Sequence, residues 1–184
     1  CVTGITGEKF LVLEEPDPRK FYLDLEKIYR AGIKSVAIVC MHAYSFHNHE
    51  KIIGNAAKKI GFSHVSLSHE VTAQIKLVSR GDTTVVDAYL TPLIQSYLKS
   101  FQKDFTDSLQ KSNTYFMQSD GGLTYAHKFK GSNSIFSGPA GGVVGYAKTT
   151  FNKQSKQPVI GFDMGGTSTD VSRFDGAYEI VYET

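Results

Sequence analysis

The sequence predicts an α/β fold, in which helices cover a β-sheet. Two observations indicate it. Short apolar segments of strand length alternate along the chain with segments whose apolar residues recur at helical spacing. The chain has 184 residues, of which 41% are hydrophobic and 21% charged, a balance typical of globular proteins rather than of disordered chains or coiled coils. This length suffices for one hydrophobic core, so one domain or a large part of one is expected.

The first part of the chain predicts three strands and two helices. In order, these are a strand at 10–13, a helix from Pro18 to just before Gly32, a strand at 35–41, a helix at about 50–60 and a strand at 64–67. Asp17 and Pro18 suit the N-cap and the first residue of the first helix, and Gly61 suits the end of the second. The continuously apolar run at 35–41 is typical of a strand buried on both faces.

The rest of the chain predicts two more helices and several short strands. In order, these are a helix from Asp82 to about Leu109, a strand at 114–118, a turn at 119–122, a short amphipathic piece, a strand-like 134–136, a helix from Gly138 to about Thr150, a polar linker at 152–157, and strands at 159–162 and 171–174. Pro92 should bend or interrupt the longest helix, because proline donates no backbone hydrogen bond. Its aromatic residues at helical spacing should lie in the core: Tyr89, Tyr97, Phe101 and Phe105.

Composition excludes several classes of function. With 20 basic and 18 acidic residues the net charge is +2, and no basic cluster is present to displace counterions from nucleic-acid phosphates. No run approaches the roughly 18 apolar residues that cross a bilayer, so no membrane or nucleic-acid partner is expected. Cys1 and Cys40 are too few for a disulfide scaffold, which predicts reduced thiols and a cytosolic protein.

Both ends of the chain suggest an interior segment of a longer protein. Residue 1 is Cys rather than Met, and residues 178–184 alternate like a strand that is still running.

The sharpest candidate site is the strand, glycine turn and strand at 159–172. Asp163 comes at the end of an apolar strand, and Gly165 and Gly166 allow backbone N–H groups to point at an anion. Thr167 and Thr169 add hydroxyl donors. A carboxylate repels phosphate but suits a magnesium ion that bridges to it. The pattern therefore indicates a metal-bound nucleotide phosphate; the alternative is a plain hairpin. Neither a Walker loop nor a dinucleotide-binding glycine motif is present.

The same hairpin resembles a phosphate-binding hairpin of the superfamily of actin, sugar kinases and heat-shock-chaperone ATPases. That resemblance implies a partial ribonuclease H-like, actin-type ATPase lobe. The preceding helix resembles the superfamily's connecting helix between two lobes, and its small-residue face would let another helix approach closely. The alternative for this helix is ordinary tight packing. Its glycines are Gly138, Gly141, Gly142 and Gly145.

The order of several motifs along the chain is similar to that of the hydantoinase A and 5-oxoprolinase family, from about Phe10 onward. These motifs are Met41-His-Ala-Tyr44 with His49-Glu50, Ser68-His-Glu-Val71, Arg80 with Thr83-Thr-Val-Val-Asp-Ala-Tyr-Leu-Thr-Pro92, Met117-Gln-Ser-Asp-Gly-Gly-Leu123, Ser137-Gly-Pro-Ala-Gly-Gly142 and Gly161-Phe-Asp-Met-Gly-Gly-Thr-Ser-Thr-Asp-Val-Ser172. A run of ordered motifs is far more specific than any one of them.

The family resemblance implies ATP-dependent opening of a cyclic amide. ATP would activate the lactam carbonyl oxygen of 5-oxo-L-proline, and water would then give L-glutamate, ADP and phosphate, as in glutathione metabolism. Asp163 would face Mg²⁺ and act in catalysis, with Asp170 orienting the turn or a water. The phosphate cradle would comprise Gly165, Gly166, Thr167 and Thr169. ATP-dependent hydantoinases and acetone carboxylases of the family would present nearly the same motifs. Two further alternatives are a nucleotide-binding module without catalytic activity and a degenerate fragment.

The resemblance also implies that this chain holds a partial ATPase domain. Residues 1–151 would form the strand and helix region with the connecting helix, and residues 158–184 the phosphate-binding hairpin. A second Asp-x-Gly-Gly-Thr hairpin and an adenosine-binding glycine motif, expected in the family, are absent. The partners expected are therefore the small-molecule substrate, the rest of the same polypeptide, and a second copy in a homodimer of the full protein; the segment alone should be inactive.

Three weaker candidates each have more than one interpretation. His42, His47, His49 and Glu50 follow a buried-type strand and could bind a metal, face a substrate, or be structural. The Asp120-Gly121-Gly122 turn could place a carboxylate and free amides at a cleft, or could be ordinary turn chemistry. Arg80 could meet a carboxylate or phosphate, and Asp82 or Thr83 after it suits a helix N-cap.

Overall fold

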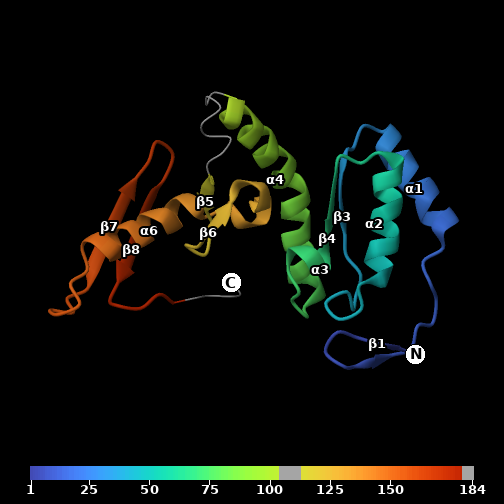
Figure 1. The fold of residues 1–184 in the computed structure, drawn as a ribbon, viewed down its shortest axis with the longest axis horizontal. Helices are drawn as coiled ribbons and strands as arrows, with labels where there is room; N and C mark the ends of the chain where they lie inside the picture. The colour runs from blue at the N-terminus through green and yellow to red at the C-terminus, as the bar shows by residue number, and fades with distance from the viewer. Residues whose placement is uncertain (104–112, 180–184) are drawn as a thin grey trace. The chain divides into compact units, whose positions relative to one another are not determined.

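The computed structural model describes residues 1–103 and 113–179 and forms two compact units (Figure 1). The first unit comprises residues 1–103 with 130–132, and the second comprises the other described residues. Within the described ranges, no helix is both long and apolar enough to span a membrane.

The first unit is a three-layer α/β arrangement. Strands β3 (Ser35–Ile38) and β4 (His64–Leu67) pair in parallel, joined by helix α2 (Asn48–Ile60). Helix α1 (Pro18–Arg30) packs on α2 on one side of the strands, and helix α4 (Leu77–Lys103) packs on the other side (Figure 1). The α/β prediction is confirmed for this unit. Its hydrophobic core forms where α1 and α2 pack together, from Leu25, Ala57 and Phe62.

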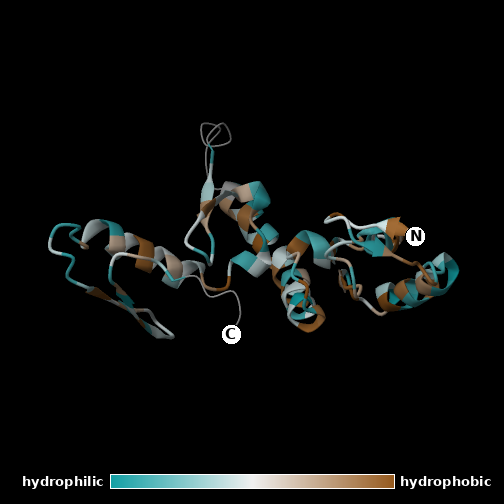
Figure 2. Cartoon of the chain, turned by 90° about the horizontal axis from the view of Figure 1, so that it is seen from below, coloured by the Kyte–Doolittle hydropathy of each residue, from teal (hydrophilic) through white to brown (hydrophobic). Residues whose placement is uncertain are grey.

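The ends of α1 and α2 follow the predicted capping chemistry. The Asp17 carboxylate accepts a hydrogen bond from the Arg19 backbone N–H at 2.9 Å, and Pro18 is the first helical residue. Helix α2 ends at Gly61, whose φ of 113° is left-handed, the conformation that favours glycine after a helix. Both helices carry hydrophobic and hydrophilic residues together, as amphipathic helices do (Figure 2).

Two strand predictions of this unit need correction, and one short helix was not predicted. The predicted strand at 10–13 is wrong beyond its first residue, because β2 (Lys9–Phe10) pairs with β1 (Val2–Thr3) and then ends. Strand β3 stops at Ile38 instead of continuing to 41, and among the described residues it has a strand neighbour on one edge only. A short helix α3 (Ser68–Val71), which the sequence analysis missed, follows β4 directly.

Helix α4 begins five residues before its predicted start, so Asp82 and Thr83 lie inside it and the predicted N-cap there is wrong. Its predicted end near Leu109 lies outside the described residues. The helix is not interrupted at Pro92. The Ala88 carbonyl, which in a regular helix would accept the N–H of residue 92, accepts the Ser35 hydroxyl at 2.5 Å.

We expect Ser35→Ala to lower the free energy of unfolding by about 1 kcal/mol, because the Ala88 carbonyl then loses the hydroxyl that donates to it. Urea unfolding would measure this change. The matched control is Ser63→Ala, whose exposed hydroxyl donates to the Lys34 carbonyl at 2.9 Å and whose loss should matter much less. Equal effects of the two variants would contradict the compensating role of Ser35.

The buried face of α4 is polar rather than aromatic. Arg80, Thr84, Asp87 and Thr91 are buried, whereas Tyr89 and Tyr97 are 71% and 58% exposed. The prediction that the aromatic stripe forms core is therefore wrong for Tyr89 and Tyr97. Of its other two members, Phe101 is half-buried and Phe105 lies outside the described residues. Arg80 and Asp87 face β3 and β4 because their hydrogen-bond partners lie in those strands or directly after them: Cys40, Met41, Ser66 and Ser68.

The second unit contains two antiparallel hairpins and one helix. Its elements are β5 (Tyr115–Met117) paired with β6 (Leu123–Tyr125), the 3-10 turn η1 (Ala126–Lys128), α6 (Ser137–Thr149), and β7 (Val159–Met164) paired with β8 (Thr169–Phe174); the 3-10 turn η2 (Gly131–Asn133) lies at the boundary of the units. The predicted strands and helix are confirmed within one or two residues, except that the strand-like 134–136 is a turn.

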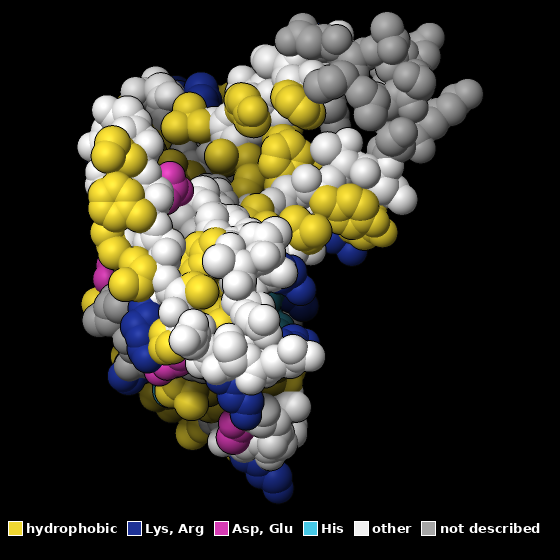
Figure 3. Space-filling view, turned by 90° about the vertical axis from the view of Figure 1, so that its left-hand side faces the viewer, with side chains coloured by type: hydrophobic (Ala, Val, Ile, Leu, Met, Phe, Trp, Pro, Cys, Tyr) yellow, Lys and Arg dark blue, Asp and Glu magenta, His cyan; other side chains and the backbone are white. Residues whose placement is uncertain are grey.

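The two faces of the β7–β8 hairpin have different environments. One face packs on α6, where the ring of Tyr146 lies so close that a Cβ at Gly161 would stand 2.1 Å from it, and the Tyr146 hydroxyl is 3.0 Å from that of Ser172. The side chains of the opposite face, called here the outer face, are between 63% and 73% exposed: Ile160, Phe162, Met164 and Val171. Figure 3, which views this end of the chain, shows hydrophobic side chains at the surface in several patches.

Candidate functional site

Asp163 and Asp170 lie directly opposite each other on the two strands of the hairpin. Opposed residues of an antiparallel pair project to the same face, and here it is the face toward α6. A Cβ at Gly142 of α6 would stand 3.4 Å from the Asp163 carboxylate. Within the described residues this exposed carboxylate has neither a hydrogen bond nor an ion pair, so both of its oxygens are available to a ligand.

The turn that joins the two strands leaves room above its glycines. The Gly165 N–H donates to the Ser168 carbonyl at 2.9 Å and closes the turn. Neither Gly165 nor Gly166 has a left-handed φ, and among the described residues nothing lies within 4 Å of where a Cβ of Gly166 would stand. The second glycine therefore preserves open space rather than an unusual conformation, and the neighbouring Thr167 is exposed.

The structure separates Thr169 from the other predicted ligands. Thr169 is paired with Met164, so its side chain projects to the outer face, away from Asp163 and Asp170. Ser168, which the sequence analysis did not single out, donates from its hydroxyl to the Asp170 carboxylate at 3.4 Å. Asp170 thus contacts the turn, as an orienting residue would.

The four glycines of α6 have different surroundings. Gly142 faces Asp163, and a Cβ at Gly141 would stand 3.6 Å from the Met117 side chain of β5. Gly138 and Gly145 face open space within the described residues. One side of the helix therefore packs on the hairpins, and two glycines remain free for the close approach of another segment.

The Asp120 turn is built as ordinary turn chemistry. The Asp120 carboxylate accepts the Gly122 N–H at 2.8 Å, and Gly121 has a left-handed φ of 80°. The turn packs on α6, where a Cβ at Gly121 would stand 3.0 Å from Val144. Ser119 accepts the Phe136 N–H at 3.0 Å and so joins this hairpin to the start of α6. Both the Asp120 turn and Asp163 therefore contact α6. The Asp120 carboxylate, however, already accepts the Gly122 N–H.

Glu50 belongs to a buried network and not to a metal site. In the described part of the chain no group of three histidine, cysteine or acidic side chains is placed to hold a metal ion. The fully buried Glu50 carboxylate accepts the Cys40 N–H at 2.8 Å, the Ser68 hydroxyl at 2.5 Å and the His69 N–H at 3.1 Å, and lies 2.7 Å from His69 Nδ1. These contacts support a structural role for Glu50, which joins Cys40, Ser68 and His69.

The three histidines before Glu50 are dispersed. His42 packs against Phe10 with the two rings tilted by 39°, His47 stacks on His69 with ring centroids 4.1 Å apart, and His49 Nε2 lies 3.0 Å from the Glu15 carboxylate. Burial, together with the neighbouring His69, lowers the pKa of His47, which favours its neutral form.

The Cys40 thiol is free, and burial together with the Glu50 carboxylate raises its pKa to about 11. A thiol with so high a pKa stays protonated and is a poor nucleophile at neutral pH.

Arg80 is fully buried and donates five hydrogen bonds inside the first unit. Its Nε donates to the Ser68 hydroxyl at 3.0 Å. Its two terminal nitrogens donate to backbone carbonyls, which are those of Gln74, Ile75, Cys40 and Met41. All five donors of the guanidinium are thus used within the chain, so Arg80 joins the end of β3 to β4 and α4 and is not available to a phosphate.

A second buried polar cluster centres on Asp87, which the sequence analysis missed. Its carboxylate accepts the hydroxyls of Ser66 at 2.7 Å, Thr91 at 3.0 Å and Ser132 at 2.9 Å, and lies 3.6 Å from His64 Nε2. Burial alone would raise the pKa of this carboxyl, but the hydrogen bonds from His64, Ser66 and Ser132 outweigh it and hold the pKa well below its usual range. The i, i+4 spacing of Asp87 and Thr91 was the available sequence signal.

We expect acid to destabilise the first unit partly through Asp87. The pKa of an unfolded aspartate is about 3.9, and the pKa of Asp87 in the folded chain is lower. The stabilisation is therefore fully present above the unfolded pKa, and it is lost as the pH falls through the folded pKa. Measuring the free energy of unfolding between about pH 6 and pH 2 should show a smaller dependence in Asp87→Asn than in the native chain. Identical pH profiles would contradict this assignment.

Comparison with known proteins places both units in one family. The family model described as hydantoinase/oxoprolinase matches residues 80–184, and that of the hydantoinase/oxoprolinase N-terminal region matches residues 3–61. The 5-oxoprolinases of Dictyostelium discoideum and Saccharomyces cerevisiae are each 51% identical to the chain over 98% of its length. The chain spans only 15% and 14% of these two relatives.

Two solved structures share the fold. The ATP-dependent caprolactamase from Pseudomonas jessenii matches 91% of this chain and 25% of its own, with a TM-score of 0.71 and 27% identity. A nucleotide-free acetone carboxylase matches 84% of this chain and 22% of its own, with a TM-score of 0.70 and 24% identity, a likeness that concerns the fold alone.

Proposed function

Because this chain belongs to the hydantoinase/oxoprolinase family, we propose that it is part of an ATP-dependent enzyme that opens 5-oxo-L-proline to L-glutamate with release of ADP and phosphate. The observation that carries the proposal is the unpartnered Asp163 carboxylate beside the open Gly165-Gly166-Thr167 turn. Similarity to the 5-oxoprolinases supports the choice of cyclic amide, and similarity to the ATP-dependent caprolactamase supports the use of ATP.

The residues at the hairpin suit a magnesium-bound phosphate. Mg²⁺ is usually held by one or two carboxylates together with waters and phosphate oxygens, and Asp163 and Asp170 present two carboxylates on one face. Within the described residues, the backbone N–H groups of Gly166 and Thr167 donate no hydrogen bond. They and the Thr167 hydroxyl are free to donate to phosphate oxygens beside that open space.

Each residue then has a definite task. Asp163 holds the metal ion or its waters at the end of β7, and Asp170, fixed by the Ser168 hydroxyl, orients the turn or a water. Gly142 keeps α6 from crowding the Asp163 carboxylate. When bound, magnesium-ATP would supply a phosphoryl group to the lactam carbonyl oxygen, which makes the carbonyl carbon a far better electrophile. Water adds to that carbon, the carbon–nitrogen bond of the ring breaks with the nitrogen leaving as the amine of glutamate, and hydrolysis then releases the phosphate. Thr169, on the outer face, is omitted from this cradle.

The proposal extends to the parent protein. The hairpin and α6 are assigned to a ribonuclease H-like, actin-type ATPase lobe, and the other half of the ATP site is assigned to a different part of the parent polypeptide. The relatives are long enough for this, since the chain spans 14% to 15% of them. The parent protein is further proposed to be a homodimer in the cytosol.

The test is release of phosphate and glutamate by the parent protein with magnesium-ATP, with and without 5-oxo-L-proline, beside the 184-residue chain alone. We expect equimolar release of both products only when the parent and 5-oxo-L-proline are combined. Phosphate release that ignores 5-oxo-L-proline would overturn the substrate assignment. Release of glutamate without ATP would overturn the role given to the hairpin.

A further inference from the structure

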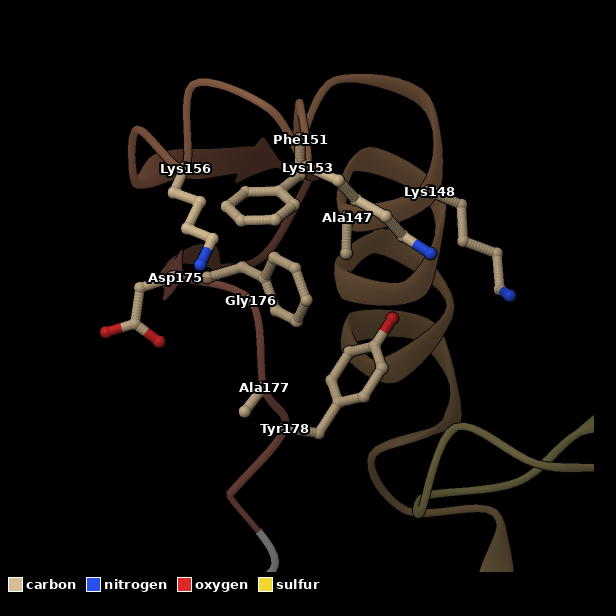
Figure 4. A pocket seen from close by; sticks show the side chains of 10 residues that line it. Ala147, Lys148, Phe151, Lys153, Lys156, Asp175, Gly176, Ala177 and Tyr178 are labelled. Carbon is tan, nitrogen blue, oxygen red and sulfur yellow. The ribbon is translucent and has the colours of Figure 1, made fainter.

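A pocket of about 790 Å³ lies within the second unit, at the base of the β7–β8 hairpin (Figure 4). The C-terminal end of α6, the linker after it and the chain that leaves β8 enclose it. Its size falls in the range of sites that hold small organic molecules. Asp163 lies four residues along β7 from Val159 at the base of the hairpin, so the pocket stands roughly 13 Å from Asp163. The residues that matter for its chemistry are Lys148, Lys153, Lys156, Phe151, Phe174 and Tyr178.

Positive charge predominates among the residues that line the pocket. Three of its lining residues are Lys148, Lys153 and Lys156, and none of their ammonium groups has a hydrogen bond or ion pair within the described residues. The acidic lining residue, Asp175, is paired with Arg173 at 2.9 Å. Figure 4 shows the Asp175 carboxylate directed away from the rings. The pocket therefore presents up to three uncompensated charges to a ligand.

Aromatic rings form the apolar part of the same pocket. Phe151 and Phe174 meet edge to face with centroids 5.1 Å apart, and Phe174 and Tyr178 lie 4.9 Å apart. In Figure 4 the side chains of Lys153 and Lys156 flank the ring of Phe151, and the hydroxyl of Tyr178 points back toward the pocket. Ring faces of this kind accept a flat apolar group by stacking.

The linker that carries two of the lysines is held in a defined conformation. The Asn152 side chain accepts the Gln154 N–H at 2.8 Å, and the Asn152 carbonyl accepts the Lys156 N–H at 2.9 Å. Lys156 has a left-handed φ of 52°, uncommon for a residue with a Cβ. Phe151 is placed by contact with Gly176, where a Cβ would stand 3.2 Å from the ring. Charge and ring are thus positioned together before any ligand binds.

We propose that this pocket binds a small organic anion with two or three negative charges and a planar apolar portion. The lysines neutralise the charges, and the planar portion lies against the aromatic rings. This site does not depend on the proposed reaction, since no residue of the hairpin turn lines it.

The probe for the test is 1-naphthyl phosphate, which combines a flat ring with a doubly charged group. Inorganic phosphate supplies the charge alone, and 1-naphthol the ring alone. Calorimetric titration of the parent protein should show binding of 1-naphthyl phosphate at least about ten-fold tighter than that of either simpler probe, and weaker binding at higher ionic strength. Absence of binding would overturn the proposal.

Variants locate the binding. The double variant Lys153→Gln with Lys156→Gln should weaken it about five- to ten-fold, because two ion pairs are lost, and Tyr178→Leu should reduce the advantage over inorganic phosphate. The matched control Lys99→Gln removes an exposed charge from α4 and should change nothing. Thermal unfolding checks that each variant is folded. Unchanged affinity in the lysine double variant, or loss of binding in Asp163→Asn, would contradict the assignment to this pocket.

Discussion

Asp163→Ala is expected to reduce ATP turnover by the parent protein by at least about 10²-fold, the scale seen when one charge-stabilising group is removed from an active site. The carboxylate lies at the end of β7, exposed and without a partner in the described residues, so its loss removes the proposed metal ligand and no folding contact. Phosphate release with magnesium-ATP and 5-oxo-L-proline measures the effect, and the thermal unfolding midpoint should stay within about 2 °C.

The matched control is Asp175→Ala, on the same hairpin. That carboxylate is also exposed, but it is already paired with Arg173 at 2.9 Å and stands at the other end of β8. It should leave turnover unchanged. Normal turnover in Asp163→Ala would refute the phosphate site at this hairpin, and a large loss in both variants would show a general effect of charge.

Arg80→Met is expected to lower the free energy of unfolding by about 3–5 kcal/mol, the scale for removing one partner from a buried charged network. Four backbone carbonyls and the Ser68 hydroxyl lose their donor at once, and methionine supplies no replacement. Arg80→Lys should recover only part of the loss, because one ammonium group cannot reproduce the planar fork. Urea unfolding of the three proteins measures both changes.

A surface arginine provides the control for this prediction. Arg30 pairs with Glu26 at 2.8 Å across one turn of α1, with most of its side chain exposed. Exposed pairs of this spacing contribute about 0.3–0.5 kcal/mol, so Arg30→Met should have a correspondingly small effect. If the two variants were equally destabilising, the buried network would not be what stabilises this end of the sheet.

The fold was predictable where local chemistry decides it. Asp17, Pro18 and Gly61 mark helix ends through their own backbone preferences, and the structure has those ends as expected. Helix α4 was misread because helical spacing alone does not say which face is inward. Its aromatic residues are more apolar than Asp87 and Arg80, which favours an aromatic buried face. Asp87 and Arg80 nevertheless face the strands, because residues distant in the sequence form hydrogen bonds with them there.

The candidate site divides in the same way. That Asp163 ends a strand beside a glycine turn could be predicted, since strand and turn are adjacent in sequence. That Gly142 approaches Asp163, and that Ser168 rather than Thr169 accompanies Asp170, depend on packing and register. A register difference of one residue reverses the face of every side chain in a strand, so spacing alone could not place Thr169.

The outer face of the β7–β8 hairpin has a practical consequence for protein production. Ile160, Phe162 and Met164 of β7 and Val171 of β8 present large apolar side chains to solvent, and the β7 segment contains no proline. Exposed strands of this composition associate with one another. The 184-residue chain expressed alone should therefore oligomerise or precipitate as its concentration rises, and replacement of Phe162 by lysine should keep it in solution.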